Sequence, residues 1–263
     1  MPHASDFRFC HLHAQDGVLT VTLHRPEVLN ALHRAAHLEL SDVFDLYAAD
    51  PSLRVAIVTG SGSRAFCVGE DLKERAMHGE YDYPKGGFGG ITMRFDLWKP
   101  VIAAVNGLCL GGGTEILAAC DLAIAEAHAQ FALPEPRVGL AALGGGALQR
   151  LARQLPMKEA MWIALTGQRI GAEEARAIGL VNRVVPAGQA MQAAQALARQ
   201  IIECAPLAVE CTKQVMMQST ACRDLEEAMH ATYPAAERML ASADAKEGPR
   251  AFAEKRAPRW SGQ

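Results

Sequence analysis

The sequence predicts an α/β fold in which parallel strands and helices form layers, followed by a helical C-terminal region. Two observations carry this prediction. Through the first two-thirds of the chain, short apolar runs typical of buried strands alternate with glycine-rich turns and helical segments, which favours a parallel, layered sheet. From about Pro186 onward the pattern becomes helical, and Ala, Gln, Glu, Met and Arg dominate it.

The individual elements follow in chain order. The predicted strands are residues 17–23, 55–59, 101–105 and 122–125. The predicted helices are residues 37–47, 191–204, 207–219 and 225–232, with further helical turns to residue 252. We therefore expect one domain, with a core at residues 1–186 that carries the functional site and a helical extension at residues 187–263.

Composition argues against several classes of function. The chain has 263 residues, half of them apolar, and a formal charge of −3 with a pI near 6.3. This balance gives no electrostatic reason to expect nucleic acid or an anionic membrane as a partner. Apolar runs are far shorter than the ~20 residues that span a bilayer, and the first residues lack the layout of a signal peptide. We expect a cytoplasmic protein.

The cysteines and histidines do not predict a metal site. Seven cysteines are scattered without a Cys-x-x-Cys pair, which indicates reduced, mostly buried thiols rather than a disulfide framework. His11 and His13 alternate on a predicted strand and share a face, but no acidic or cysteine partner follows at ligand spacing. We expect no metal.

The first glycine-rich segment, residues 60–65, satisfies the loose form of a dinucleotide-binding fingerprint after a strand. A Tyr-x-x-x-Lys pattern at Tyr81 and Lys85 would fit the same nicotinamide chemistry. However, residues 66–69 follow where the fingerprint needs a helix N-terminus, and Pro84 would break the helix that must present Tyr81 and Lys85 together. A plain surface turn is the better interpretation.

A second segment places three consecutive glycines, Gly111 to Gly113, between a strand and an apolar helix. Glycines at a helix entrance let a ligand approach the backbone, and the first N–H groups of a helix lack internal partners. Those groups suit a developing oxyanion, although close strand–helix packing is an alternative. Glu115 stands in the first turn of this helix, where it could be catalytic or could only stabilise the helix dipole.

The third segment holds Glu135 between Pro134 and Pro136, ahead of another glycine-rich turn at residues 144–146. Two prolines restrict the backbone on both sides, so the side chain is held in place without a helix. A lone loop glutamate can be a capping or surface residue, but this setting favours a functional one.

Taken in order, these motifs resemble those of the crotonase (enoyl-CoA hydratase/isomerase) superfamily. The matching stretches are residues 23–26, 29–32, 65–72, 99–107, 111–115, 120–122, 134–135, 174–175, 179–186 and 252–256. Each is weak alone, but their order and spacing across nearly the whole chain are highly specific. The resemblance implies a crotonase-like spiral of ββα units with a C-terminal helical region that joins a homotrimer, often paired into a hexamer.

The resemblance also implies an acyl-CoA thioester as substrate, with no separate cofactor. It places two oxyanion-hole donors on the backbone N–H groups of Glu70 and Gly112, and the two water-activating glutamates of hydratases at Glu115 and Glu135. The presence of both favours hydration of 2-enoyl-CoA to 3-hydroxyacyl-CoA, with Glu115 as main base and Glu135 as proton donor. An isomerase or another acyl-CoA lyase of this family, or a non-catalytic binding protein of the same fold, are the alternatives.

For coenzyme A itself, the resemblance implies main chain along the adenine, basic side chains near the phosphates, and C-terminal residues that reach the nucleotide, sometimes in a neighbouring subunit. The corresponding residues are Arg25, Ala65, Val68, Lys73, Phe252 and Lys255.

Three features depart from the family pattern. Glu70 stands where a small residue is common, and Leu143 stands where a glycine often backs the catalytic water. Residues 77–90, rich in Gly, Tyr and Lys, are expected to form a mobile wall of the acyl pocket. The sequence therefore leaves the acyl group open.

Overall fold

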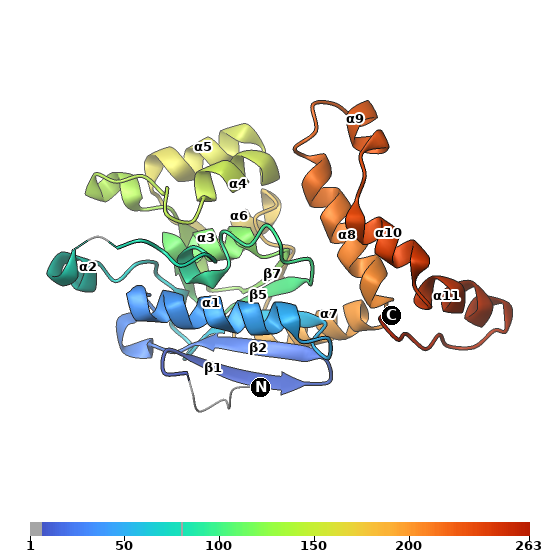
Figure 1. The fold of residues 1–263 in the computed structure, drawn as a ribbon. Coiled ribbons are helices and arrows are strands. Elements are labelled where there is room, and N and C mark those ends of the chain that lie inside the picture. Colours follow the sequence, from blue (N-terminus) through green and yellow to red (C-terminus); the bar gives the residue numbers. More distant parts are fainter. Residues whose placement is uncertain (1–6, 80) are drawn as a thin grey trace.

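The structure is a computed structural model that describes residues 7–79 and 81–263. It has a layered α/β core followed by an arm of helices (Figure 1). A six-stranded sheet forms the base of the core, in the order β1-β2-β3-β5-β7-β10, and only β1 and β2 pair antiparallel. Its strands are β1 (Cys10–Gln15), β2 (Val18–Leu23), β3 (Val55–Gly60), β5 (Val101–Val105), β7 (Leu122–Glu126) and β10 (Arg183–Val185).

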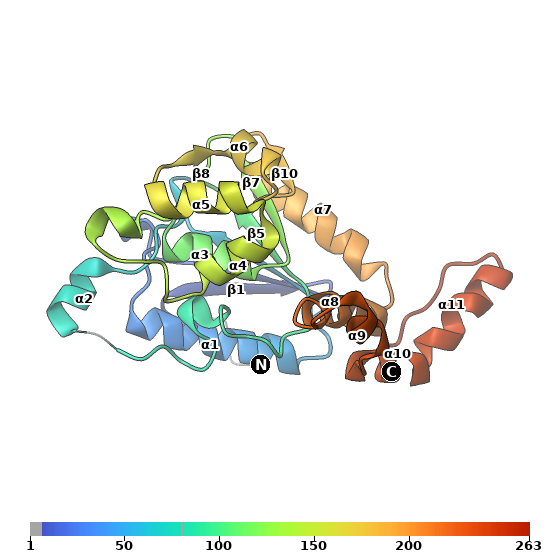
Figure 2. The ribbon, with the colours of Figure 1, turned by 90° about the horizontal axis from the view of Figure 1, so that it is seen from above.

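The central strands of this sheet are buried on both faces, which explains their continuous apolar runs. In β3, Ala56 and Val58 contribute to the main core with helix α1 (Arg34–Ala49), whereas Val55 and Ile57 pack against helix α7 (Ala190–Ile202). Helices α1 and α7 thus cover opposite faces, as the two views show (Figures 1 and 2). The predicted strands at residues 55–59, 101–105 and 122–125 are confirmed.

A second sheet has the order β4-β6-β8-β9, and only β8 and β9 pair antiparallel. Its strands are β4 (Ala65–Cys67), β6 (Leu108–Leu110), β8 (Gln130–Ala132) and β9 (Ile170–Gly171). A strand of the first sheet, a strand of the second and then a helix follow one another three times. The three helices are α2 (Leu72–His78), α3 (Gly112–Ala119) and α4 (Ala147–Gln154). This repetition confirms the predicted ββα units.

The repeats stack so closely that their turns touch backbone to backbone. A Cβ atom on Gly113, in the first turn of α3, would lie only 2.0 Å from the carbonyl oxygen of Cys67 in the preceding repeat. No larger residue fits there without moving the main chain. The chain is therefore fixed at the point where the first and second repeats meet.

The remaining helices complete the core and build the arm. They are η2 (Pro26–Val28), η3 (Phe88–Gly90), η4 (Glu135–Val138), α5 (Met157–Thr166), α6 (Ala172–Ala177), α8 (Pro206–Ser219), α9 (Leu225–His230), α10 (Pro234–Ala241) and α11 (Asp244–Ala253). Helix α7 packs on the first sheet, so the helical region begins on the core, and α8 to α11 extend away from it (Figures 1 and 2). The division at residue 186 stays a prediction.

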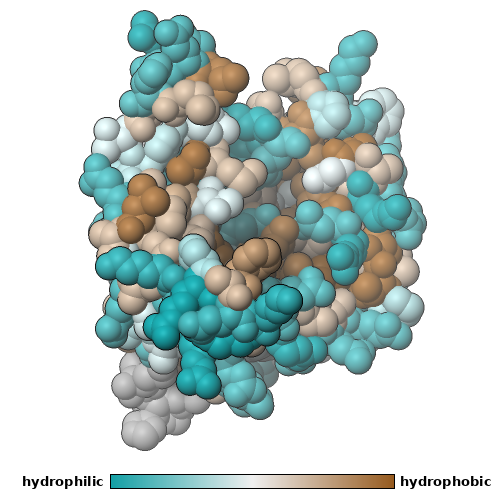
Figure 3. All heavy atoms as spheres, turned by 90° about the vertical axis from the view of Figure 1, so that its right-hand side faces the viewer, coloured by the Kyte–Doolittle hydropathy of each residue, from teal (hydrophilic) through white to brown (hydrophobic). Residues whose placement is uncertain are grey.

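The arm exposes large apolar side chains. They are Met216, Met217, Leu225, Met229, Leu240 and Phe252. The side of the molecule that carries the arm shows apolar side chains around a central hollow (Figure 3). Within residues 7–79 and 81–263, no helix combines the length and the apolar character needed to cross a membrane. The same described residues contain no cluster of three or more His, Cys, Asp or Glu side chains that could hold a metal ion.

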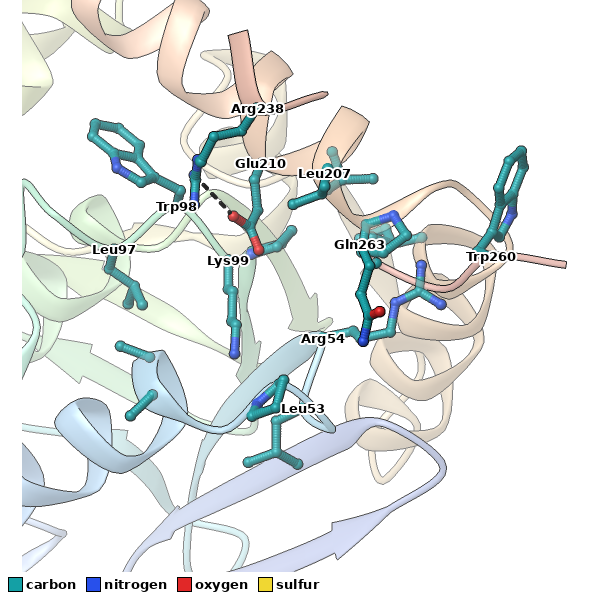
Figure 4. Close-up of a pocket in the computed structure, with 18 of the residues that line it drawn as sticks. Leu53, Arg54, Leu97, Trp98, Lys99, Leu207, Glu210, Arg238, Trp260 and Gln263 are labelled. Atoms are coloured by element: carbon teal, nitrogen blue, oxygen red, sulfur yellow. Dashed lines mark hydrogen bonds and ion pairs between the residues drawn. The ribbon is translucent and has the colours of Figure 1, made fainter. Parts of the chain in front are cut away.

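A cavity of about 430 Å³ lies where the arm meets the core. Trp98 and Lys99 line it from the core, and Glu210 and Arg238, 3.4 Å apart, line it from α8 and α10, with Trp260 at its edge (Figure 4). None of the four candidate catalytic residues lines this cavity. The candidate active site lies elsewhere, at the entrance of α3.

Candidate active site

The glycine-rich turn between β6 and α3 presents a backbone amide to the site. Gly111 has φ +54°, a conformation that favours glycine, and its N–H donates to Ala132 O at 2.9 Å. Helix α3 begins at Gly112, whose N–H belongs to the unpaired first turn of the helix. A Cβ atom on Gly112 would lie 2.2 Å from Cζ of Phe88, so the ring of Phe88 occupies the space where any side chain at this position would lie.

The second turn that meets this one carries Glu70. A Cβ atom on Gly69, φ +96°, would lie 2.9 Å from the nitrogen of Gly112. The main chain of Leu32 hydrogen-bonds to the two residues that flank Glu70. Its N–H donates to Gly69 O at 2.8 Å, and its carbonyl oxygen accepts from Asp71 N–H at 2.7 Å. Within the described residues, neither the Glu70 N–H nor the Gly112 N–H donates a hydrogen bond to protein. Two amides on touching turns are therefore available to an oxyanion.

Glu115 lies in the first turn of α3 and is buried, with 3% of its surface exposed. Its Oε1 accepts from Ala147 N–H at 3.3 Å. Burial raises the pKa of Glu115; the N–H groups of Gly145 and Ala147 and the charge of Arg150 offset part of the rise, and the charge of Glu70 adds to it. The carboxyl can therefore hold a proton closer to neutral pH than a free glutamate does.

Glu135 is the first residue of η4 and lies across the glycine-rich turn. A Cβ atom on Gly111 would be 2.9 Å from its Oε1, while its Oε2 is buried and has no hydrogen-bond partner among the described residues. Burial raises the pKa of Glu135, its own N–H lowers it in part, and the charge of Glu115 raises it further. The charge of Glu115 therefore acts on Glu135, and among the described residues Glu135 Oε2 has no hydrogen-bond partner.

Arg150 from α4 fixes the turn that lies against Glu115. Its guanidinium donates to Gly145 O at 2.9 Å and to Thr92 O at 2.5 Å. A Cβ atom on Gly145 would be 2.7 Å from Cβ and Oε2 of Glu115, so this glycine, rather than position 143, contacts the carboxylate. Leu143 itself is 67% exposed. Arg150 is a positioning residue that the sequence patterns did not single out.

The side chain of Glu70 also faces the site rather than solvent alone. Its Oε2 accepts from Arg75 Nη1 at 2.7 Å and from Tyr83 Oη at 3.5 Å. A Cβ atom on Gly144 would lie 3.2 Å from the same Tyr83 hydroxyl. The sequence left the direction of this carboxylate open, and the structure places it beside the turn that contacts Glu115.

An aromatic wall, formed by His37, Tyr81, Tyr83 and Phe88, stands next to these carboxylates. Ring centroids of Tyr83 lie 5.2 Å from His37, 5.7 Å from Tyr81 and 5.7 Å from Phe88. His37 is fully buried, and its Nδ1 accepts from Gly89 N–H at 3.0 Å. Of the segment 77–90, which was expected to form a mobile wall, residues 81–89 are thus anchored on α1 through contacts that no sequence motif marks, and residue 80 lies outside the described residues.

The candidate coenzyme A residues are spread over the molecule. Arg25 pairs with Asp71 at 2.9 Å and lines a second cavity together with His24 and His33. Ala65 is buried in β4, and Lys73 is exposed on α2. Phe252 and Lys255 are exposed at the end of α11, which both ribbon views place on the side opposite α2 (Figures 1 and 2). Within one chain, Phe252 and Lys255 therefore lie apart from the other candidate coenzyme A residues.

The nicotinamide alternative does not fit the structure. Strand β4, rather than a helix, follows the turn at residues 60–64, and Tyr81 and Lys85 lie outside any helix. The turn that carries the loose fingerprint therefore offers no helix N-terminus to a pyrophosphate.

Comparison with known proteins agrees with this geometry. A family model described as enoyl-CoA hydratase/isomerase matches residues 13–263. The chain belongs to the enoyl-CoA hydratase/isomerase family. A carnitinyl-CoA dehydratase of Proteus mirabilis is 44% identical over 263 residues, which covers 96% of this chain and 98% of the relative. The corresponding Escherichia coli enzyme is 43% identical over 262 residues, with the same coverage.

Solved structures extend the match to three dimensions. An enoyl-CoA hydratase of Mycobacterium marinum superposes with a TM-score of 0.91 at 41% identity, over 97% of this chain and 99% of that chain. One of Bacillus anthracis gives a TM-score of 0.90 at 34% identity, over 97% and 100%. The protein therefore has the crotonase fold and is a hydro-lyase of the enoyl-CoA hydratase type, a family that implies an acyl-CoA thioester as substrate.

Proposed function

We propose that the protein adds water reversibly across the double bond of a 2-enoyl-CoA thioester to give a 3-hydroxyacyl-CoA. The observation that carries the proposal is the second carboxylate, Glu135, with a buried and unpartnered Oε2 and a pKa that burial and the charge of Glu115 raise. A single carboxylate suffices to move a double bond, whereas a pair can hold and activate a water molecule. The pair therefore favours hydration over isomerisation.

The reaction begins at the thioester carbonyl. Attack by water on the β-carbon places negative charge on the thioester oxygen, where the N–H groups of Glu70 and Gly112 stabilise it. These amides lie on turns held together by main-chain contacts, so they need no rearrangement when the charge develops. Loss of one such donor typically lowers the rate by ~10²–10³.

The two glutamates move the protons. Glu115 takes a proton from the water molecule while the water oxygen bonds to the β-carbon. Glu135 gives a proton to the α-carbon. The pair starts and ends with one proton, shared as coupled groups share it. The raised pKa of each carboxyl lets one stay protonated beside the other, as this exchange requires.

The test is loss of the absorbance of conjugated enoyl thioesters, with short, long, branched and aromatic acyl chains. The Glu135→Gln variant is expected to lower kcat by ~10²–10⁴, the usual contribution of a general acid or base, while thioester binding persists. Glu126→Gln is the matched control, because Glu126 is buried beside α7, where it accepts from Ala190 N–H, outside the site. Full hydratase rate in Glu135→Gln would remove Glu135 from the mechanism.

Two other outcomes decide between the alternatives. Turnover of 3-enoyl thioesters without hydration would make the protein an isomerase. A folded protein that binds coenzyme A thioesters and turns over none of them would be a binding protein. Carnitinyl-CoA is itself a 3-hydroxyacyl thioester whose acyl chain ends in a trimethylammonium group, so the name of the relatives adds cationic acyl chains to the substrates to be tested.

For coenzyme A, we infer that the main chain at Ala65 and Val68 lies along the adenine and that Arg25 and Lys73 meet the phosphates. Phe252 and Lys255 would then act on a neighbouring subunit, because α11 lies far from α2 within one chain. The exposed apolar side chains of the arm support assembly into a homotrimer or a dimer of trimers. Light scattering tests this assembly, and a monomer at all concentrations would contradict it.

A further inference from the structure

The surroundings of the two glutamates are not equivalent, and the difference bears on which of them carries the proton that the pair shares. We propose that Arg150 keeps Glu115 ionised and leaves the shared proton on Glu135, because it holds the turn that donates to Glu115 and places a fixed positive charge beside it. This inference rests on the proposed function, because it concerns the pair that moves protons in that reaction.

Arg150 connects separate parts of the site from helix α4. Its Nη1 donates to Gly145 O at 2.9 Å, and its Nη2 donates to Thr92 O at 2.5 Å. Gly145 packs on the carboxylate of Glu115, since a Cβ atom on this glycine would lie 2.7 Å from Oε2. One guanidinium therefore ties the turn that contacts Glu115 to the segment that follows η3.

The two carboxyl groups differ in the donors around them. Burial raises the pKa of Glu115, but the N–H groups of Gly145 and Ala147 offset part of the rise, and Ala147 N–H donates to Oε1 at 3.3 Å. Burial and the charge of Glu115 raise the pKa of Glu135, and its Oε2 has no partner among the described residues. Donors stabilise an ionised carboxylate, whereas a buried oxygen without a donor favours the protonated form. The shared proton therefore belongs on Glu135, the group that gives it to the α-carbon.

Arg150 also supplies positive charge to a site that is rich in carboxylates. Its charge lowers the pKa of Glu115, whereas the charge of Glu70 raises it. Among the described residues Arg150 makes no ion pair, while Arg75 pairs with Glu70 at 2.7 Å. The other titratable side chains around the site are neutral near pH 7, because burial raises the pKa of the thiols and phenols and lowers that of the imidazole. They are Cys67, Cys109, Cys120, Tyr81, Tyr83 and His37.

Two variants of Arg150 separate its charge from its hydrogen bonds. Arg150→Gln removes the charge and keeps an amide that can donate to a carbonyl oxygen. Arg150→Lys keeps the charge but loses the planar fork that reaches Gly145 O and Thr92 O together. Arg153→Gln is the matched control, because Arg153 is exposed on the same helix and donates to Gln149 O. Hydration of an enoyl thioester is measured for each protein between pH 5.5 and pH 9.

The pH profile of kcat/KM distinguishes the effect of charge from loss of support. Glu115 acts as a base only when it is ionised, and without the nearby positive charge it binds its proton at higher pH, so the profile of Arg150→Gln is expected to move to higher pH. Its loss of kcat/KM should be about tenfold larger on the acid side of the optimum than on the alkaline side, because a neighbouring charge changes the proton affinity of a carboxyl by at least this factor. Arg150→Lys should lower kcat/KM and keep the wild-type profile, and Arg153→Gln should change neither. A wild-type profile in Arg150→Gln, or a shifted one in Arg150→Lys, would overturn the inference.

An infrared titration separates this inference from the proposed function, because it needs no turnover and no variant of Arg150. The C=O bands of the two protonated carboxyl groups are assigned by their loss in Glu115→Gln and in Glu135→Gln. In the wild-type protein the Glu135 band is expected to persist to higher pH than the Glu115 band, and the reverse order would overturn the inference.

The same titration shows which of the two proposals fails. The expected order of the bands, with the Glu115 band persisting to higher pH in Arg150→Gln, would retain the role of Arg150 even in a protein that hydrates no thioester, and would refute the hydratase. Hydration by a protein whose Glu115 band does not move in Arg150→Gln would refute the role of Arg150 and retain the hydratase.

Discussion

The buried His37 makes the protein sensitive to acid, and the size of the effect follows from its surroundings. Burial, with a smaller contribution from the charge of His33, lowers the pKa of His37 from 6.5 to about 3. Below pH 6.5 the unfolded chain binds a proton at this position that the folded chain refuses, so stability falls as the pH falls. Below pH 3 the loss of unfolding free energy from His37 amounts to roughly 5 kcal/mol, and at pH 5 it is about 2 kcal/mol.

The perturbation that isolates this effect is His37→Asn. The Oδ1 of asparagine can replace Nδ1 as the acceptor of the Gly89 N–H, while the group no longer titrates. Urea unfolding is followed by tryptophan fluorescence at pH 7.5 and pH 5.0, with both proteins at one concentration so that subunit association contributes equally. The three tryptophans provide the signal.

The wild-type protein is expected to lose about 2 kcal/mol more unfolding free energy between these two pH values than His37→Asn does. Other groups titrate in both proteins and cancel in the difference. Equal losses in the two proteins would show that His37 is protonated in the folded state or that the ring is accessible to water, and the reasoning would be wrong.

Three further changes probe the site and its support. Gly112→Ala puts a Cβ atom 2.2 Å from Phe88 Cζ and is expected to lower hydratase kcat/KM by ~10²–10³ because the amide moves. Gly145→Ala crowds Glu115 at 2.7 Å and should lower kcat in the same assay, with little change in the urea midpoint. Asn106→Ala removes three hydrogen bonds, two of them buried, and is expected to cost about 1–3 kcal/mol in urea unfolding; an unchanged midpoint would contradict this.

The apolar pattern of the sequence predicts the longer strands of the fold, and the elements that it misses have physical reasons. Strands of five or six buried residues, such as β3 and β5, are long enough to leave a continuous apolar run. Strands β4, β6, β8 and β9 have two or three residues, too few for any period to stand out, yet they form the second sheet. Helix α1 begins before the predicted start because His33, an uncommon N-cap, accepts from Ala36 N–H.

The same distinction applies to the site. Glu115 and Glu135 are marked by their own neighbours in sequence, three glycines and two prolines, so they could be predicted. His37, Tyr83 and Arg150 could not, because α1, the segment before η3, and α4 meet only in the folded chain. The glycines at residues 86–90 were the available signal: a Cβ atom on Gly90 would lie 2.3 Å from the backbone of Leu40, which shows close approach to α1.

Because the amides at the turns of Gly69 and Gly112 belong to the main chain, the stabilisation of charge and the choice of acyl group depend on different parts of the protein. The proposed oxyanion hole consists of main-chain N–H groups, so ordinary side-chain substitutions elsewhere leave it in place. The aromatic wall consists of side chains, with Tyr81, Tyr83 and Phe88 on one segment and His37 on α1. Drift in that wall can exchange one acyl preference for another while the machinery for adding water is inherited intact. Such a scaffold can diversify without passing through inactive ancestors.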